Sequence, residues 1–226
     1  MMSQLPLDLG HRTALGGADF HVAASNRQAV AWLDRWPDWP AGGLAVHGPP
    51  GSGKTHLAHV WIDRAGACLI APGDLAGLDP HRVAAAGPVA IDALGEAAPG
   101  AEAERQLLHL YNALTASGRT LLLLGRRPPA RWPLRLADLR SRLVALPTVA
   151  VAMPDDELFR AVLAKLFAHR QLAVGPDLLR YLGARIERSF ESARDIVGRL
   201  DRAALAARRP VGLPLARELL GDADED

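Results

Sequence analysis

The 226 residues are 49% hydrophobic and 23% charged, which is typical of a globular protein and is enough for one α/β core with a small helical addition. The formal net charge of +1 argues against strong DNA binding through the chain's own charge, because such proteins carry a clearly basic surface. The sequence shows no signal-peptide pattern and no apolar run long enough to span a bilayer, which predicts a cytoplasmic protein without a membrane partner. The single cysteine, Cys68, excludes a disulfide framework and is expected to be a buried strand residue.

The first two thirds of the chain alternate between helical and strand-like segments. Residues 1–18 contain three glycines and no periodic pattern, so we expect a flexible tail there. Helices are predicted over about 26–36, 53–64, 102–117 and 137–144, and strands over 44–47, 68–71, 89–91, 121–124 and 149–151. The segments 72–87 and 95–101, rich in glycine, alanine and proline, are expected to be loops. This alternation predicts a five-stranded parallel sheet flanked by helices.

The pattern changes after Met153 and Pro154. Helices are predicted over 155–169, 177–187, 190–208 and 215–220, with no strand between them. We therefore expect an α/β base over residues 19–153, an all-helical lid over 154–220 and an acidic tail over 221–226.

A glycine-rich segment between the first strand and the following helix matches the complete Walker A pattern. Its residues are Gly48, Pro49, Pro50, Gly51, Ser52, Gly53, Lys54 and Thr55. Glycines at these positions let backbone N–H groups point at phosphate oxygens, and the N-terminus of the helix adds a partial positive charge. Lys54 is expected between the β- and γ-phosphates, and the Thr55 hydroxyl is expected to bind Mg²⁺. The segment predicts binding of ADP or ATP with Mg²⁺.

The strand over 89–91 ends in Asp92, as a Walker B segment does, and Asp92 is expected to hold the Mg²⁺ ion through water. The next position, where such ATPases commonly carry an acid that orients the attacking water, is Ala93. Because a lost base typically costs ~10²–10⁴ in rate, the sequence predicts tight nucleotide binding with slow intrinsic hydrolysis. Glu96 is an alternative source of the missing carboxylate.

Several segments resemble the DnaA branch of the AAA+ family, over about residues 18–220. The Walker A motif continues as Gly-Lys-Thr-His-Leu, and the segments before it, Ala18-Asp19-Phe20 and Ser25-Asn26-Arg27, resemble the approach to the nucleotide site. Three later segments resemble the sensor 1 region, the box VII helix and the sensor 2 region: Gly125-Arg126-Arg127-Pro128-Pro129, Leu139-Arg140-Ser141-Arg142-Leu143 and Ala193-Arg194-Asp195-Ile196. The resemblance implies an AAA+ P-loop NTPase fold with a C-terminal helical lid.

The resemblance also implies roles for individual residues. Arg142 would be an arginine finger that acts in trans on the nucleotide of a neighbouring molecule. Arg194 would contact the chain's own nucleotide from the lid. An ion pair with Glu191 is the alternative role for Arg194. His56 is also expected to contact the nucleotide. Arg126 departs from the short polar or acidic residue usual in the family, which puts ordinary sensor 1 behaviour in doubt.

Within the family, the chain is most similar to the Hda proteins, which promote hydrolysis of DnaA-bound ATP and work in the ADP form. The last six residues leave no room for the helix-turn-helix domain of DnaA, so no sequence-specific DNA binding is expected. The N-terminal segment resembles the peptide by which bacterial proteins bind the replicative sliding clamp, the β subunit of DNA polymerase III. Its matching residues are Gln4, Leu5, Leu7 and Leu9.

The resemblance therefore implies a regulator of replication initiation whose partners are the DNA-loaded clamp and DnaA, and it allows a homo-oligomer. Two other interpretations stay open, a DnaC-like helicase loader and a DnaA-like ATPase adaptor. A loader would show robust turnover and no need for residues 4–9.

Overall fold

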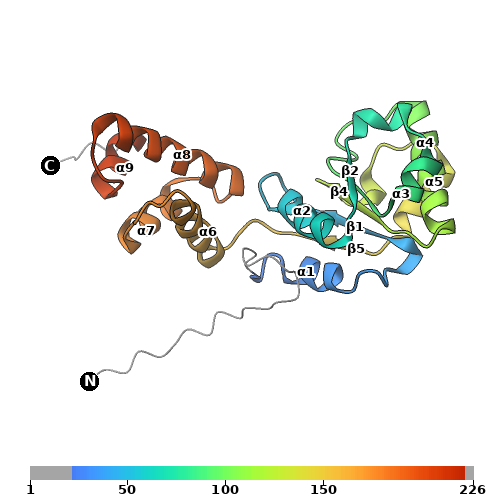
Figure 1. Ribbon diagram of the computed structural model, residues 1–226, viewed down its shortest axis with the longest axis horizontal. Helices are drawn as coiled ribbons and strands as arrows, with labels where there is room; N and C mark the ends of the chain where they lie inside the picture. The colour runs from blue at the N-terminus through green and yellow to red at the C-terminus, as the bar shows by residue number, and fades with distance from the viewer. Residues whose placement is uncertain (1–21, 222–226) are drawn as a thin grey trace, which may run out of the picture.

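The computed structural model describes residues 22–221. The predicted clamp-binding residues, the tail expected over residues 1–18 and residues 222–226 lie outside them. The base holds one parallel sheet of five strands in the order β2-β3-β4-β1-β5 (Figure 1). The strands are β1 Gly43–His47, β2 Cys68–Ile70, β3 Val89–Ile91, β4 Leu121–Gly125 and β5 Thr148–Ala150. The predicted architecture, an α/β base with a five-stranded parallel sheet followed by a helical region, is confirmed.

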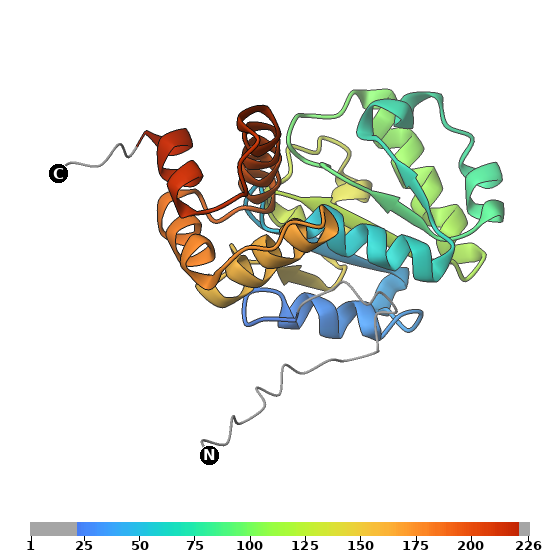
Figure 2. The ribbon, with the colours of Figure 1, turned by 60° about the vertical axis from the view of Figure 1, so that its left-hand side comes forward.

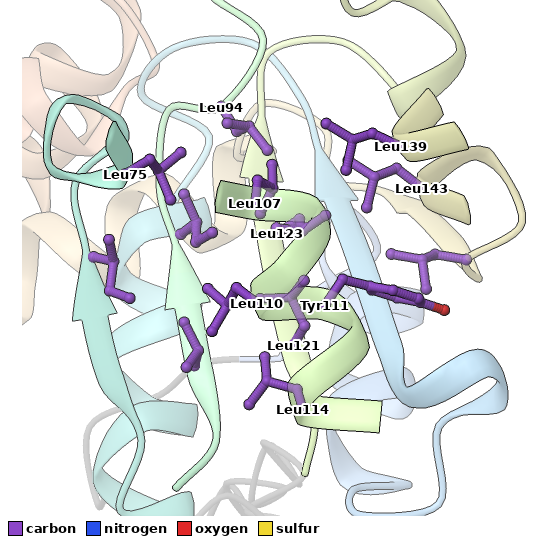
Figure 3. Packing of buried hydrophobic residues seen from close by; sticks show 14 of the residues in the cluster. Leu75, Leu94, Leu107, Leu110, Tyr111, Leu114, Leu121, Leu123, Leu139 and Leu143 are labelled. Carbon is purple, nitrogen blue, oxygen red and sulfur yellow. The ribbon is translucent and has the colours of Figure 1, made fainter. Parts of the chain in front are cut away.

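The strands are apolar on both faces because helices cover both faces. In β4, Leu121 and Leu123 pack into one hydrophobic cluster and Leu122 and Leu124 pack into the other. The first cluster lies under α3 (Pro80–Ala86), α4 (Ala101–Ala116) and α5 (Ala137–Val144), as Figure 3 shows for its larger side chains. The second lies under α1 (Arg27–Asp34) and α2 (Lys54–Ala65). A run of four leucines is thus divided evenly between the two halves of the core.

Two sequence-based expectations were wrong. The segment 72–87 is not a loop, because it forms the 3₁₀ helix η2 (Pro72–Gly77) and α3. Asp79 caps α3 by accepting hydrogen bonds from the backbone N–H groups of His81 and Arg82, at 3.1 Å each. Cys68 is exposed and not buried, because β2 is the edge strand of the sheet and only its last residue reaches the core.

The C-terminal part contains helices and no strand up to residue 221. They are α6 Asp156–His169, α7 Pro176–Arg185, α8 Phe190–Ala207 and α9 Leu213–Leu220. Figure 2 shows these helices packed together. They enclose a hydrophobic core of their own, which includes Phe159, Phe167 and Leu200. The predicted boundary near residue 154 fits the gap between β5 and α6 and stays a prediction. Within residues 22–221 no helix has the length and apolarity needed to cross a membrane.

One buried carboxylate holds the chain where it enters α5. Glu104, in the first turn of α4, is 2% exposed. Its oxygens accept hydrogen bonds from the backbone N–H of Arg135, at 3.0 and 3.1 Å, and from that of Leu136, at 2.6 Å. Leu136 is the N-cap residue of α5, so Glu104 fixes the start of the helix that carries Arg142.

We predict that Glu104→Ala lowers the free energy of unfolding by about 1–3 kcal/mol, because the backbone N–H groups of Arg135 and Leu136 lose their buried partner. Urea unfolding followed by circular dichroism measures the change. Glu102→Gln, which alters an exposed carboxylate two residues earlier in the same helix, serves as the control and is expected to leave the unfolding midpoint nearly unchanged. Equal midpoints for all three proteins would contradict the role of Glu104.

Candidate nucleotide-binding site

The glycine-rich segment follows β1 at the carboxyl edge of the sheet. The Gly48 N–H donates to the Gly125 carbonyl of β4 at 3.2 Å, and the Val151 N–H donates to the His47 carbonyl at 2.7 Å. A Cβ atom at position 48 would lie 2.1 Å from the Val151 carbonyl oxygen, so only glycine fits there. The start of the loop is therefore fixed between β4 and the residue that follows β5.

The loop curls around the amino group of Lys54. Gly51 and Gly53 have φ angles of +72° and +94°, in the left-handed region that favours glycine. The Lys54 Nζ atom donates to the carbonyl oxygens of Gly48 and Pro49, at 2.8 Å each, and to the Ser52 Oγ at 3.4 Å. Backbone carbonyls thus hold the ammonium group inside the loop, where phosphate oxygens of a bound nucleotide would meet it.

Charged groups surround Lys54 on the sheet side. Burial lowers the pKa of its ammonium group from the ordinary value. The carboxylates of Asp92 and Glu96 raise this pKa in turn, and the guanidinium of Arg126 lowers it. These four side chains therefore share one electrostatic environment at the carboxyl edge of β1, β3 and β4.

Thr55 and Asp92 meet as the sequence predicts. The Thr55 hydroxyl donates to the Asp92 Oδ2 at 2.7 Å, and Asp92 Oδ1 accepts from the Ala93 N–H at 2.7 Å. A hydroxyl and a carboxylate at this distance fit the all-oxygen coordination of Mg²⁺ beside phosphates. Ala93 is exposed with φ of +60°, and its methyl group can neither donate nor accept a proton.

Glu96 and Arg126 form an ion pair, with 2.8 Å between Glu96 Oε1 and Arg126 Nε. Glu96 belongs to the segment after β3, and Arg126 directly follows β4. Glu96, the alternative source of the acid missing at position 93, is therefore paired with Arg126. Arg126 is the residue that departs from the family pattern in the segment that resembles the sensor 1 region.

The lid contacts the phosphate loop directly. The Phe190 N–H, at the start of α8, donates to the Gly51 carbonyl at 3.0 Å. A Cβ atom at position 51 would lie 2.3 Å from the Ser189 Cβ, and one at position 53 would lie 2.8 Å from the Phe190 Cε2. The sequence predicts a helix starting at 190 but gives no sign that its first turn touches the loop.

A pocket of about 280 Å³ opens between the start of α2 and the lid. Its lining residues are His56, Val162, Lys165, Leu166, His169, Phe190 and Arg194. His56 and Arg194, which the resemblance implies for nucleotide binding, thus line the same pocket. No ion pair joins Arg194 to Glu191 within the described residues.

Arg142 lies elsewhere, on α5. Its Nε donates to the Asp138 Oδ1 at 3.2 Å, and its guanidinium stands 5.9 Å from the centre of the Tyr111 ring. Tyr111 packs in the cluster under α4 and α5, whereas α2, which continues the phosphate loop, covers the other face of the sheet. The contacts of Arg142 are therefore made away from the chain's own phosphate loop.

Comparisons with known proteins agree with this geometry. Residues 155–220 match the family model described as "Hda, lid domain". Domain III of the replication initiation protein DnaA from Thermotoga maritima has a similar structure, with a TM-score of 0.78 and 17% identity, over 92% of this chain and 95% of that chain. AMPPCP-bound DnaA from Aquifex aeolicus matches with a TM-score of 0.70 and 15% identity, over 85% of this chain and 66% of that chain.

A RuvB structure from Thermotoga maritima is also similar, with a TM-score of 0.66 and 13% identity, over 89% of this chain and 69% of that chain. At these identities the solved structures show the shared fold, and the family model adds the relation of the lid. The chain therefore shares the fold of DnaA domain III and of RuvB, and its residues 155–220 are similar to the lid domain of Hda.

Proposed function

We propose that this chain is a regulator of replication initiation that carries a nucleotide in its P-loop and stimulates hydrolysis of ATP held by DnaA. The Hda-type lid and the DnaA-like fold support the role of a DnaA-related replication regulator. In this proposal residues 4–9 dock on the DNA-loaded sliding clamp, and Arg142 reaches the nucleotide of DnaA. Hydrolysis of that ATP then prevents re-initiation.

The position of Arg142 is the observation that carries the proposal. The residue is bound on the α4 and α5 side of the sheet, with its side chain 41% exposed, so it can be presented to another molecule. A guanidinium placed at the terminal phosphate of a neighbour stabilises the negative charge that develops during transfer of the phosphoryl group. Its exposed ion pair with Asp138 is weak and is readily exchanged for that partner.

The nucleotide in the chain's own P-loop would act as a structural ligand. Lys54, the loop amides and the α2 N-terminus would bind the phosphates, and Thr55 and Asp92 would hold a Mg²⁺ ion whose charge offsets that of the phosphates. His56 and Arg194 would close the site from the base and from the lid. With Ala93 in place of an acid we expect weak intrinsic hydrolysis. The choice of ADP as the resident ligand rests on the resemblance to the Hda proteins.

We predict that Lys54→Ala weakens binding of both ADP and ATP by at least about tenfold, because the ammonium group that meets the phosphates is lost. Isothermal titration calorimetry in the presence of Mg²⁺ measures both affinities. Arg105→Ala, which removes an exposed positive charge on α4, serves as the control. Unchanged nucleotide affinity in Lys54→Ala would contradict the P-loop assignment.

We predict that Arg142→Ala lowers the stimulated hydrolysis of DnaA-bound ATP by about 10³-fold or more, since an arginine finger contributes ~10³–10⁵ to the rate. Single-turnover hydrolysis of ATP pre-bound to DnaA, with clamp loaded on DNA, measures the effect. Arg142→Lys should recover little, because one ammonium group cannot replace the planar guanidinium.

Arg105→Ala is again the matched control, because Arg105 also belongs to a helical ion pair of the base, with Glu102. Wild-type protein that fails to stimulate hydrolysis would contradict the proposal and favour the helicase-loader interpretation. Full stimulation by Arg142→Ala would remove the finger role while leaving a regulator of another kind.

We predict that Gln4→Ala lowers stimulation only when the clamp is present on DNA, because it weakens docking and leaves Arg142 intact. A tethered activator acts at a raised effective concentration, so a large excess of the variant should restore the rate. The same single-turnover assay at two concentrations separates the effects. Loss of stimulation that excess protein does not restore would argue against a docking role for residues 4–9.

A further inference from the structure

The two segments that carry Glu96 and Arg126 are fixed to each other by their backbones. The Leu94 N–H donates to the Leu124 carbonyl at 2.9 Å. A Cβ atom at Gly125 would lie 2.7 Å from the Leu94 carbonyl oxygen, which shows how closely the segments approach. The ends of β3 and β4 therefore move together, and their positions relative to the P-loop are set by the sheet.

Trp132 fixes the same two segments from the side. It is 4% exposed, and its Nε1 donates to the Arg127 carbonyl at 2.7 Å. Its ring lies against Gly95, where an added Cβ atom would come within 2.2 Å of the Trp132 Cδ1. Glu96 and Arg126 thus extend from a well-supported backbone, and a change of partner needs only rotation of exposed side chains.

This ion pair stands beside the phosphate loop. Gly125, whose carbonyl binds the Gly48 N–H, immediately precedes Arg126. The charges of Glu96 and Arg126 both affect the pKa of the Lys54 ammonium group, which the loop carbonyls hold in place. A guanidinium at this position can bind a terminal phosphate, and a carboxylate paired with the guanidinium competes with that phosphate.

We propose that Glu96 is a specificity-determining residue, which biases the P-loop toward nucleoside diphosphates by competing with a γ-phosphate for Arg126. This inference rests on the proposed binding of nucleotide in the P-loop. With a diphosphate bound, Arg126 stays paired with Glu96. With a triphosphate bound, Arg126 must give up its ion pair with Glu96 to reach the γ-phosphate, and this loss reduces the gain from the new contact.

The exposure of the pair sets the size of the effect. Arg126 and Glu96 have side chains that are 57% and 36% exposed, so water screens their attraction. An exposed ion pair contributes little, which makes the exchange of partners easy and predicts a moderate bias, not an absolute block. In this proposal Glu96 affects nucleotide binding only through Arg126. The Arg126→Ala variant should therefore remove the effect of Glu96.

The test compares the affinities for ADP and for AMPPCP, an ATP analogue with a non-cleavable β–γ bridge, by calorimetry with Mg²⁺ on the full chain. We expect Glu96→Gln to raise the AMPPCP affinity relative to ADP by about fivefold, the equivalent of one exposed ion pair. We expect Arg126→Ala to lower that ratio, and Glu96→Gln to have little further effect in the Arg126→Ala background. Arg127→Ala removes a neighbouring exposed charge as the control.

Each outcome bears on a different claim. An unchanged affinity ratio in Glu96→Gln overturns the inference. A shift that persists at full size in the Arg126→Ala background also overturns it, because Glu96 would then act by simple repulsion of the extra phosphate. Wild-type protein that binds neither nucleotide refutes the proposed P-loop function itself, and with it the inference.

Discussion

The pairing of β4 with β1 is the interaction on which the nucleotide site depends. Because the strands are parallel, their carboxyl ends meet at one edge, which brings the P-loop after β1 next to Arg126 after β4 and Asp92 after β3. The leucines of β4 do not define its register by polarity, since a slip of one residue would still bury leucine on both faces. Two glycines restrict the register of these strands instead. Gly43 and Gly125, at opposite ends of the paired strands, approach backbone oxygens so closely that any side chain would clash.

Contact between lid and loop places a second constraint on the same glycines. Gly51 and Gly53 need positive φ angles to form the loop, and their missing side chains also leave room for Ser189 and Phe190. The conformation that exposes amides to phosphates is therefore the one that lets the lid approach. We infer that a ligand in the loop would affect the position of the first turn of α8. The Phe190 N–H donates to the Gly51 carbonyl, and the Phe190 side chain lines the pocket with His56 and Arg194.

The sequence predicted the sheet and most helices because their signals are local. Apolar runs of strand length, glycines of a phosphate loop and helical spacing in the lid are all visible over a few residues. The helix α3 was missed although Asp79-Pro80 is a clear start signal, because glycine and alanine on both sides indicated a loop. The burial of Cys68 was mispredicted for a different reason. Whether a strand lies at an edge depends on strand order, and an apolar run does not encode that order.

The candidate site also combines contacts that local motifs predict with contacts that they do not predict. Lys54, Thr55 and Asp92 come together as the motifs predict, since each motif carries its strand or helix context with it. The Glu96–Arg126 pair, the Glu104 anchor of α5 and the Ser189–Phe190 contact join residues from 30 to well over 100 positions apart, and no local pattern encodes them. The functional roles of Gln4, Arg142 and Arg194 rest on resemblance and stay predictions.

If Arg142 is the proposed arginine finger, its distance from the chain's own phosphate loop determines which nucleotide it can act on. The loop is followed by α2 on one face of the sheet, and Arg142 is held through Asp138 and Tyr111 on the other. Under the proposed function, a resident nucleotide would therefore not be the substrate of the chain's own Arg142. Slow turnover would then be useful, because a retained ligand would keep the lid and the base in one arrangement while Arg142 acted on another molecule. On this argument Ala93 agrees with the proposed function, because a nucleotide that acts as a structural ligand does not need to be hydrolysed.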